Sequence, residues 1–170
     1  MKEFTKALIS DKSSDKFADE QKLFGQFVGD WDFEWIDGKG TDKERHVRGE
    51  WLFSWILDGA AIQDVFICPS RAERLKNEQP DATYGTTLRV YNPTSGTWNI
   101  CFAYYGSMVT LEAKQEGEQI VVRMLHTNGF IKHWVFSDIT DNSFHWEDKM
   151  SLDNGATWVV TGELFATRKE

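Results

Sequence analysis

Residues 29–38 are GDWDFEWIDG, and this stretch decides the fold class. Its aromatic residues, Trp31, Phe33 and Trp35, alternate with acidic residues, which is the period of a strand with one face in a core and one in water. The Asp-Gly pair at its end is typical of a tight turn. The same alternation returns in residues 51–57, which are again followed by Asp-Gly. These two segments predict neighbouring antiparallel strands.

Strand patterns continue at regular spacing toward the end of the chain. After residues 61–68, they cover residues 84–91, 97–105, 107–115, 119–126, 130–138, 143–151 and 157–167. The connections are short and rich in turn-forming residues, except for the polar residues 69–82, which predict a short helix or a lid. About ten strands joined in this way form an antiparallel meander, and closure into a barrel removes its edges. We therefore predict an all-β fold with a closed barrel.

The N-terminal part of the chain has a different pattern. Residues 18–28 place their apolar side chains at helical spacing, so a short helix is predicted before the first strand. Residues 1–18 are polar and mixed in charge, which predicts a loose arm or a short helix. The chain is therefore expected to be a single domain, residues 1–170, in which residues 19–170 form the barrel.

Composition excludes several classes of protein. The chain has 170 residues, with 19 Lys and Arg against 27 Asp and Glu, and its net charge of −8 makes nucleic acid a poor partner. No apolar run approaches the roughly 20 residues of a membrane span, so no membrane partner is expected. The first residues lack the apolar core of a secretory signal, and we expect a cytoplasmic protein. Cys68 and Cys101 are expected as buried reduced thiols, although the sequence leaves a disulfide open.

The aromatic content is high, with 8 Trp, 12 Phe and 4 Tyr, and strand register decides which rings face inward. At the turn 153–155, a three-residue loop pairs Met150 with Trp158 and Trp146 with Gly162. We prefer this register to a two-residue loop because it sorts the two faces better, with Asp148 as the one acid on the apolar face. The inward residues are then Phe144, Trp146, Met150, Trp158, Val160 and Leu164.

At the turn 127–129, two registers remain open, and we favour a three-residue loop. In that register Trp134 and Phe136 share the inward face with Ile120, Val122, Met124 and His126. In the alternative, a two-residue loop, the face is shared with Ile131, His133 and Val135. His126 faces inward in both registers.

Several motifs resemble a known family. Gly29-Asp30-Trp31, which opens the first strand after a short helix, resembles the Gly-x-Trp signature of lipocalins and the wider calycins. In that family the tryptophan closes the barrel floor under a basic residue from near the last strand, and Arg168 stands at that place. A closer likeness, over residues 24–168, is to bacterial lipocalin-like domains of unknown function. It is carried by GEWLFSWILDG (49–59), AIQDVFI (61–67), YGTTLRVY (84–91) and SLDNGATW (151–158). The resemblance implies a calycin-like barrel and no agreed activity.

An inward set of rings predicts a pocket rather than a solid core. A barrel of about ten strands encloses more space than its side chains need, and the polar groups Tyr104, His126 and Asp148 would require partners inside it. We therefore predict a binding protein for a small, largely apolar or aromatic molecule. The predicted ligand-binding residues are Trp55, Trp98, Phe102, Tyr104, His126, Trp134, Trp146 and Trp158.

Two other functions remain open. An isomerase- or cyclase-type enzyme would use His126 and Asp148 as a proton-transfer pair in a dry cavity, so enzyme activity is undecided. A structural homodimer with a filled barrel would use exposed rings such as Tyr91 or Phe165.

Metal and cofactor signals are weak. The four histidines form no His-x-His or His-Glu-x-x-His spacing, and no metal site is predicted. No cofactor is predicted either, and the alternative is a heme ligated by an inward His126, as is known in calycin-like proteins. Arg71 and Arg74 either guide an anionic ligand to the barrel mouth or belong to a solvated loop.

Overall fold

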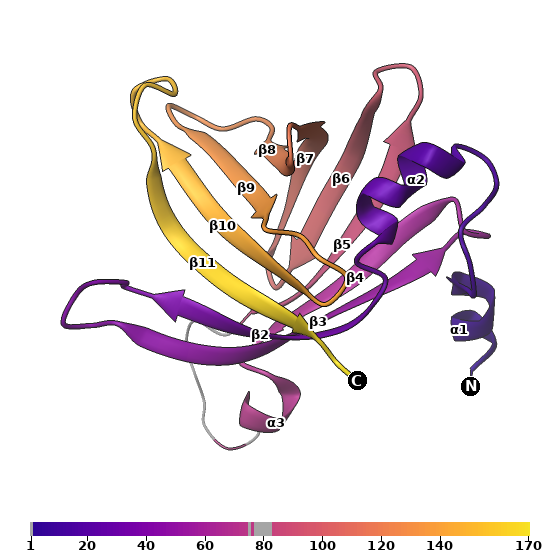
Figure 1. Ribbon diagram of the computed structural model, residues 1–170, viewed down its shortest axis with the longest axis horizontal. Coiled ribbons are helices and arrows are strands. Elements are labelled where there is room, and N and C mark those ends of the chain that lie inside the picture. The colour runs from indigo at the N-terminus through magenta and orange to yellow at the C-terminus, as the bar shows by residue number, and fades with distance from the viewer. Residues whose placement is uncertain (1, 75, 77–82) are drawn as a thin grey trace.

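The computed structural model describes residues 2–74, 76 and 83–170, and it is mostly sheet (Figure 1). The helices are α1 (Glu3–Leu8), α2 (Ala18–Gly25) and α3 (Arg71–Arg74). The strands are β1 (Ile9–Ser10), β2 (Gly29–Asp37), β3 (Arg45–Ile56), β4 (Ala61–Cys68), β5 (Thr83–Asn92), β6 (Thr97–Tyr104), β7 (Ser107–Glu116), β8 (Gln119–Met124), β9 (Ile131–Ser137), β10 (Ser143–Ser151) and β11 (Val159–Arg168). Within the described residues, no helix has the length and apolar character needed to cross a bilayer.

Strands β2 to β11 close into an antiparallel barrel. Each strand pairs with the next along the chain, and β11 returns to pair with β2, with Leu164 opposite Trp35. β1 lies outside the barrel and extends the edge of β3, where Ile9 stands opposite Ile56. The predicted all-β fold, a barrel of about ten strands preceded by a short helix, is confirmed.

The alternation in β2 builds one wall of this barrel. Trp31 and Phe33 are buried, whereas Asp30 and Asp32 between and beside them lie on the outer face. Gly49 of β3 stands opposite Phe33, and a Cβ at this glycine would collide with the Phe33 ring. The glycine therefore lets the Phe33 ring lie flat against the wall instead of projecting to the barrel axis.

The register of the β8–β9 hairpin agrees with the favoured prediction. Ile120 stands opposite Phe136 and Val122 opposite Trp134, so these side chains share the inward face. His126 does not join them. β8 ends at Met124, and His126 lies in the following turn with a positive φ of 59° and an exposed side chain. The prediction that His126 faces inward is wrong, because the turn breaks the two-residue period before this position.

The register of the β10–β11 hairpin differs from the prediction. Met150 stands opposite Val159, and a bulge between Asp148 and Lys149 then brings Trp146 opposite Leu164. Thr161 of β11 has no partner in the ladder and is the extra residue of this bulge. The hairpin therefore accommodates its extra residue within the sheet and not at the turn. Phe144, Trp146 and Leu164 are buried as predicted, but Val160 precedes the bulge and is 46% exposed on the outer face.

Helix α2 closes one end of the barrel (Figure 1). Phe24 of α2 and Phe27, which follows the helix, place their rings in the barrel interior. The Phe27 ring lies 5.0 Å from the centroids of both Phe136 and Phe144, and Phe24 meets Trp98 edge-on at 5.1 Å. This end of the interior is filled with rings.

Trp31 and Arg168 form the floor that the lipocalin resemblance implies. The Arg168 guanidinium lies 4.1 Å from the Trp31 ring centroid, and the Trp31 indole donates to the Phe27 carbonyl at 2.7 Å. Arg168 also donates to the carbonyls of Val28 at 2.8 Å and Gln26 at 2.7 Å. One basic side chain therefore ties the last strand to the segment between α2 and the first barrel strand.

The two segments without a clear strand pattern contain short elements. Within residues 1–18, the chain forms α1 and then β1. Within the polar segment 69–82, a short helix forms at Arg71–Arg74, while residues 75 and 77–82 of the predicted lid lie outside the described part. Cys68 and Cys101 form no disulfide, and both are half-buried where full burial was predicted.

Candidate ligand-binding cavity

A cavity of about 290 Å³ occupies the half of the barrel away from α2. It lies among side chains of β2 to β10, and aromatic rings form most of its wall. The lining residues are Trp35, Trp51, Phe66, Thr83, Thr87, Phe102, Tyr104, Val109, Met124, Lys132, Trp134, Trp146 and Asp148.

Two glycines explain why this half of the barrel is hollow. A Cβ at Gly85 would lie 2.7 Å from Cζ of Phe102, and a Cβ at Gly162 would lie 2.5 Å from Cζ2 of Trp35. Each ring therefore lies flat over a neighbouring strand where only glycine leaves room for it. Rings held against the wall leave the barrel axis free, and the space between them is the cavity.

The rings form a continuous surface around the cavity. Trp146 is central, with ring centroids 5.7 Å from Trp35 and 5.9 Å from Trp134. Trp134 meets Phe102 edge-on at 5.5 Å, and Phe102 stacks on Tyr104 at 5.0 Å. Flat faces and edges at these spacings suit stacking against another planar ring system.

One ion pair lies within this aromatic lining. The Lys132 ammonium is 2.8 Å from Oδ2 of Asp148, and the two side chains are 26% and 15% exposed. Oδ1 of Asp148 is buried and has no hydrogen-bond partner within the described part of the chain. A buried carboxylate oxygen without a hydrogen bond costs free energy, and a donor from water or from a ligand removes that cost.

A second, fully buried ion pair separates the cavity from the closed end. Arg89 and Asp64 pair with each other. Arg89 lies two residues after Thr87 in β5, Asp64 lies two residues before Phe66 in β4, and all four side chains share the inward face. The Arg89 guanidinium lies 5.1 Å from the ring centroid of Phe24. The interior therefore has three layers, which are the cavity, this ion pair and the ring-filled floor.

The structure brings together five of the nine residues predicted from sequence for binding or catalysis. The five that line the cavity are Phe102, Tyr104, Trp134, Trp146 and Asp148. Trp98 instead packs at the closed end against Phe24, and Trp55 lies against Gly25 of α2. Trp158 is 39% exposed and contacts His133 in a tilted arrangement with their ring centroids 4.5 Å apart.

His126 is the ninth residue, and its exposed position corrects two predictions. The structure does not bring it to Asp148, which pairs with Lys132 inside the barrel. The proposed proton-transfer pair is therefore not assembled. A heme bound inside the barrel through His126 also loses its ligand, since this side chain lies on the surface of a turn.

The predicted binding residues did not include Lys132 or the rings of Trp35, Trp51 and Phe66, which also line the cavity. Lys132 was detectable, because it lies two residues before Trp134 and shares its face in the favoured register. The Trp35 ring lies over Gly162 of a neighbouring strand, so its flat orientation becomes visible only when the strands are paired.

Arg71 and Arg74 do not line the cavity. Arg71 donates two hydrogen bonds to Oε2 of Glu50 on the outer wall, the shorter at 2.6 Å, and the Arg74 guanidinium lies 5.1 Å from the Tyr84 ring centroid. The suggestion that they guide an anionic ligand finds no support in these contacts.

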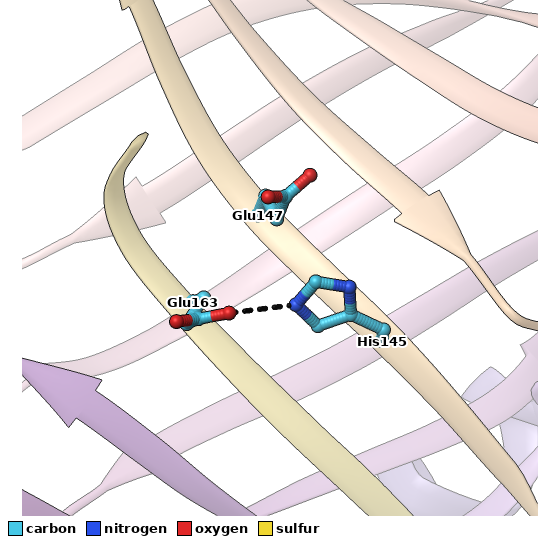
Figure 2. Close-up of side chains that lie close together, drawn as sticks. All are labelled: His145, Glu147 and Glu163. Carbon is cyan, nitrogen blue, oxygen red and sulfur yellow. Dashed lines mark hydrogen bonds and ion pairs between the residues drawn. The ribbon is translucent and has the colours of Figure 1, made fainter. Parts of the chain in front are cut away.

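A cluster of metal-ligand types lies on the outer wall of the barrel, where His145, Glu147 and Glu163 project from β10 and β11 (Figure 2). Their nearest ligand atoms all lie within 4.8 Å of one another, and Nε2 of His145 is 3.0 Å from Oε2 of Glu163. The His145-x-Glu147 spacing that puts two of them on one face was overlooked when only histidine pairs were considered.

Cations from this chain already neutralise the outer cluster. Lys39 lies 2.5 Å from Glu163, and Lys149 lies 2.6 Å from Glu147. Burial by itself raises the pKa of Glu163, but hydrogen bonds from Lys39 and His145 outweigh it and lower that pKa below its ordinary value. The cluster is a charge-balanced part of the wall, separate from the cavity.

Comparison with known proteins supports the fold. No protein-family model matches the chain, and no curated protein matches its sequence. Among solved structures, it is similar to the S-type phycobiliprotein lyase CPES from Guillardia theta, with a TM-score of 0.57 and 10% identity over 90% of this chain and 97% of that one. It is also similar to Rv2717c from M. tuberculosis, with a TM-score of 0.55 and 10% identity over 89% of this chain and 98% of that one. The fold is that of the lipocalin-like calycin barrels, as the Gly-x-Trp resemblance implied.

Proposed function

We propose that this protein binds a small, largely apolar or aromatic molecule inside its barrel. The observation that carries the proposal is the cavity of about 290 Å³ with a continuous aromatic wall, in a barrel whose other end is filled. Ligand pockets commonly measure about 300–1,000 Å³ and combine apolar walls with a few polar groups. The cavity is at the small end of that range, which favours a compact ligand.

The structural neighbours support the proposal of a ligand-binding barrel through their fold. One of them is a phycobiliprotein lyase with the same type of barrel. The enzyme alternative loses the histidine on which it depended, and we do not propose it. The cavity argues against the alternative of a barrel filled by its own side chains. A homodimer and a cytoplasmic location stay predictions.

Two measurements test the proposal. Native mass spectrometry of protein purified from its own host is expected to show a bound small molecule, which denaturation releases. Trp134→Ala is then expected to reduce the bound fraction, because the Trp134 ring lines the cavity. Phe165→Ala is the matched control, since Phe165 is an aromatic residue exposed on the outer wall. Equal loss in both variants, or a mass without ligand from the native host, would contradict the proposal.

A further inference from the structure

The charges that line the cavity define the chemistry of its ligand, provided that the proposed function is correct. Among the described residues, the charged side chains of the lining are Lys132 and Asp148, which pair at 2.8 Å. The other polar side chains of the lining are the neutral Thr83, Thr87 and Tyr104. This lining therefore has no net charge, and an ionised ligand would bring an unbalanced charge into an aromatic environment.

The Lys132–Asp148 pair still has hydrogen-bonding capacity. An ammonium carries three donors, and one of them serves Oδ2 of Asp148. On the other side, Oδ1 of Asp148 lacks a donor within the described part of the chain. The pair therefore lines the cavity with free ammonium donors beside a carboxylate acceptor. A ligand edge with a carbonyl oxygen next to an N–H group satisfies both.

The rest of the cavity determines the shape of the ligand. Trp146, Trp134 and Phe102 contact one another, with ring centroids 5.5 and 5.9 Å apart, and such an aromatic wall favours a planar molecule that stacks on it. A volume of about 290 Å³ corresponds to a compact ring system. We propose that the ligand is a neutral, fused aromatic ring system with a lactam or imide edge. Its N–H donates to Asp148 and its carbonyl accepts from Lys132.

Matched small molecules test this assignment on the full-length protein. The probes are 2-quinolinone, which has the lactam edge, N-methyl-2-quinolinone, which lacks the donor, naphthalene, which lacks both groups, and 2-naphthoate, which is ionised. Quenching of the tryptophan fluorescence reports binding, because Trp134 and Trp146 line the cavity. We expect 2-quinolinone to bind at least about tenfold more tightly than the other three, since it alone is neutral and carries the N–H that donates to the Asp148 carboxylate.

Two variants locate the preference. In Asp148→Leu the acceptor is lost, and the ratio of 2-quinolinone to N-methyl-2-quinolinone affinities is expected to fall to near one. Glu147→Gln is the matched control, because this carboxylate lies next in sequence but on the outer wall. It is expected to keep the tenfold ratio. The comparison among probes is made first on the unaltered protein, so the test does not depend on the folding of either variant.

The outcomes separate the inference from the proposed function. Equal affinity for 2-quinolinone, its N-methyl derivative and naphthalene would overturn the lactam assignment and leave a cavity that binds rings. Tighter binding of 2-naphthoate would overturn it as well, by showing that the cavity prefers an anion. Failure of all four probes would overturn the inference alone if native mass spectrometry still shows a bound molecule, and would overturn the proposed function as well if it shows none.

Discussion

The two halves of the barrel interior are both lined with aromatic residues, yet one is solid and the other hollow. At the closed end, Phe24 of α2 and Phe27, which follows this helix, place rings on the barrel axis, with centroids 5.0 Å apart between Phe27 and Phe136. In the other half, Trp35 and Phe102 lie flat over glycines of neighbouring strands. Aromatic content is therefore no guide to cavity formation. The position of the rings relative to the barrel axis decides it.

Residues of the two halves are also expected to differ in how much they contribute to folding stability and to ligand affinity. Residues of the closed end touch other side chains on every side, so their removal leaves a void in a packed region. Residues of the open half face empty space on one side, and their removal costs less packing. Substitutions in the two halves are therefore expected to give opposite profiles of unfolding free energy and ligand affinity.

The largest loss of stability is expected at the closed end. Phe27→Ala removes a fully buried ring that contacts Phe53, Phe136 and Phe144. The free energy of unfolding, measured in urea, is expected to fall by about 3–5 kcal/mol. Phe165→Ala, on the outer wall, is expected to change it by less than about 1 kcal/mol. A similar loss for the two variants would show that the closed end is not a packed core.

A smaller loss is expected at the floor. Arg168→Ala removes hydrogen bonds to the carbonyls of Val28 and Gln26 and the contact with the Trp31 ring. The expected decrease in the free energy of unfolding is about 2 kcal/mol. Arg168→Lys keeps the charge but not the planar fork, and it is expected to recover less than half of this loss. Full recovery by lysine would mean that charge alone holds the floor.

The open half is expected to show the reverse profile. Trp134→Ala removes a half-buried ring that faces the cavity, so the free energy of unfolding should fall by only about 1 kcal/mol. Affinity for a bound aromatic probe, measured by isothermal titration calorimetry, is expected to fall at least about tenfold. A variant that loses stability as Phe27→Ala does, with affinity intact, would assign Trp134 to the core.

The smallest effect is expected in the turn between β10 and β11, at the open end. Asp153 accepts hydrogen bonds from Ser151 and from the amide and hydroxyl of Thr157, at 2.6 to 2.8 Å. The side-chain hydrogen bond from Thr157 is the largest of several that lower the Asp153 pKa to about 2. Since the ordinary value is 3.8, its stabilising effect is complete above pH 4 and is lost as the pH falls toward 2.

Two measurements check this turn. Carboxyl chemical shifts followed by NMR are expected to give Asp153 a titration midpoint near 2, and a midpoint near 3.8 would show that the hydrogen bonds do not persist. Asp153→Asn removes the titrating group, and it is expected to flatten the dependence of stability on pH in this range.

The parts of the cavity that were predictable from sequence depended on register. Trp134 was placed correctly because the favoured three-residue loop puts the β9 rings opposite the inward-facing Ile120 and Val122. His126 was misplaced because the period was extended beyond the end of β8, into a turn with positive φ. The β10–β11 pairing was wrong because a bulge at Thr161 has no signature in the alternation of apolar residues.

The chain by itself determined the class of fold, since the two-residue period of GDWDFEWIDG and its repetition allow only half-buried strands. The resemblance of Gly29-Asp30-Trp31 to the Gly-x-Trp signature also implied the floor of Trp31 and Arg168, which the structure shows. Only the tertiary structure decided which half of the interior is hollow. That outcome depends on Phe27, which follows α2, reaching the axis and on Gly85 and Gly162 standing beneath rings of neighbouring strands. Such contacts join segments far apart in sequence, and side-chain periodicity within one strand carries no information about them.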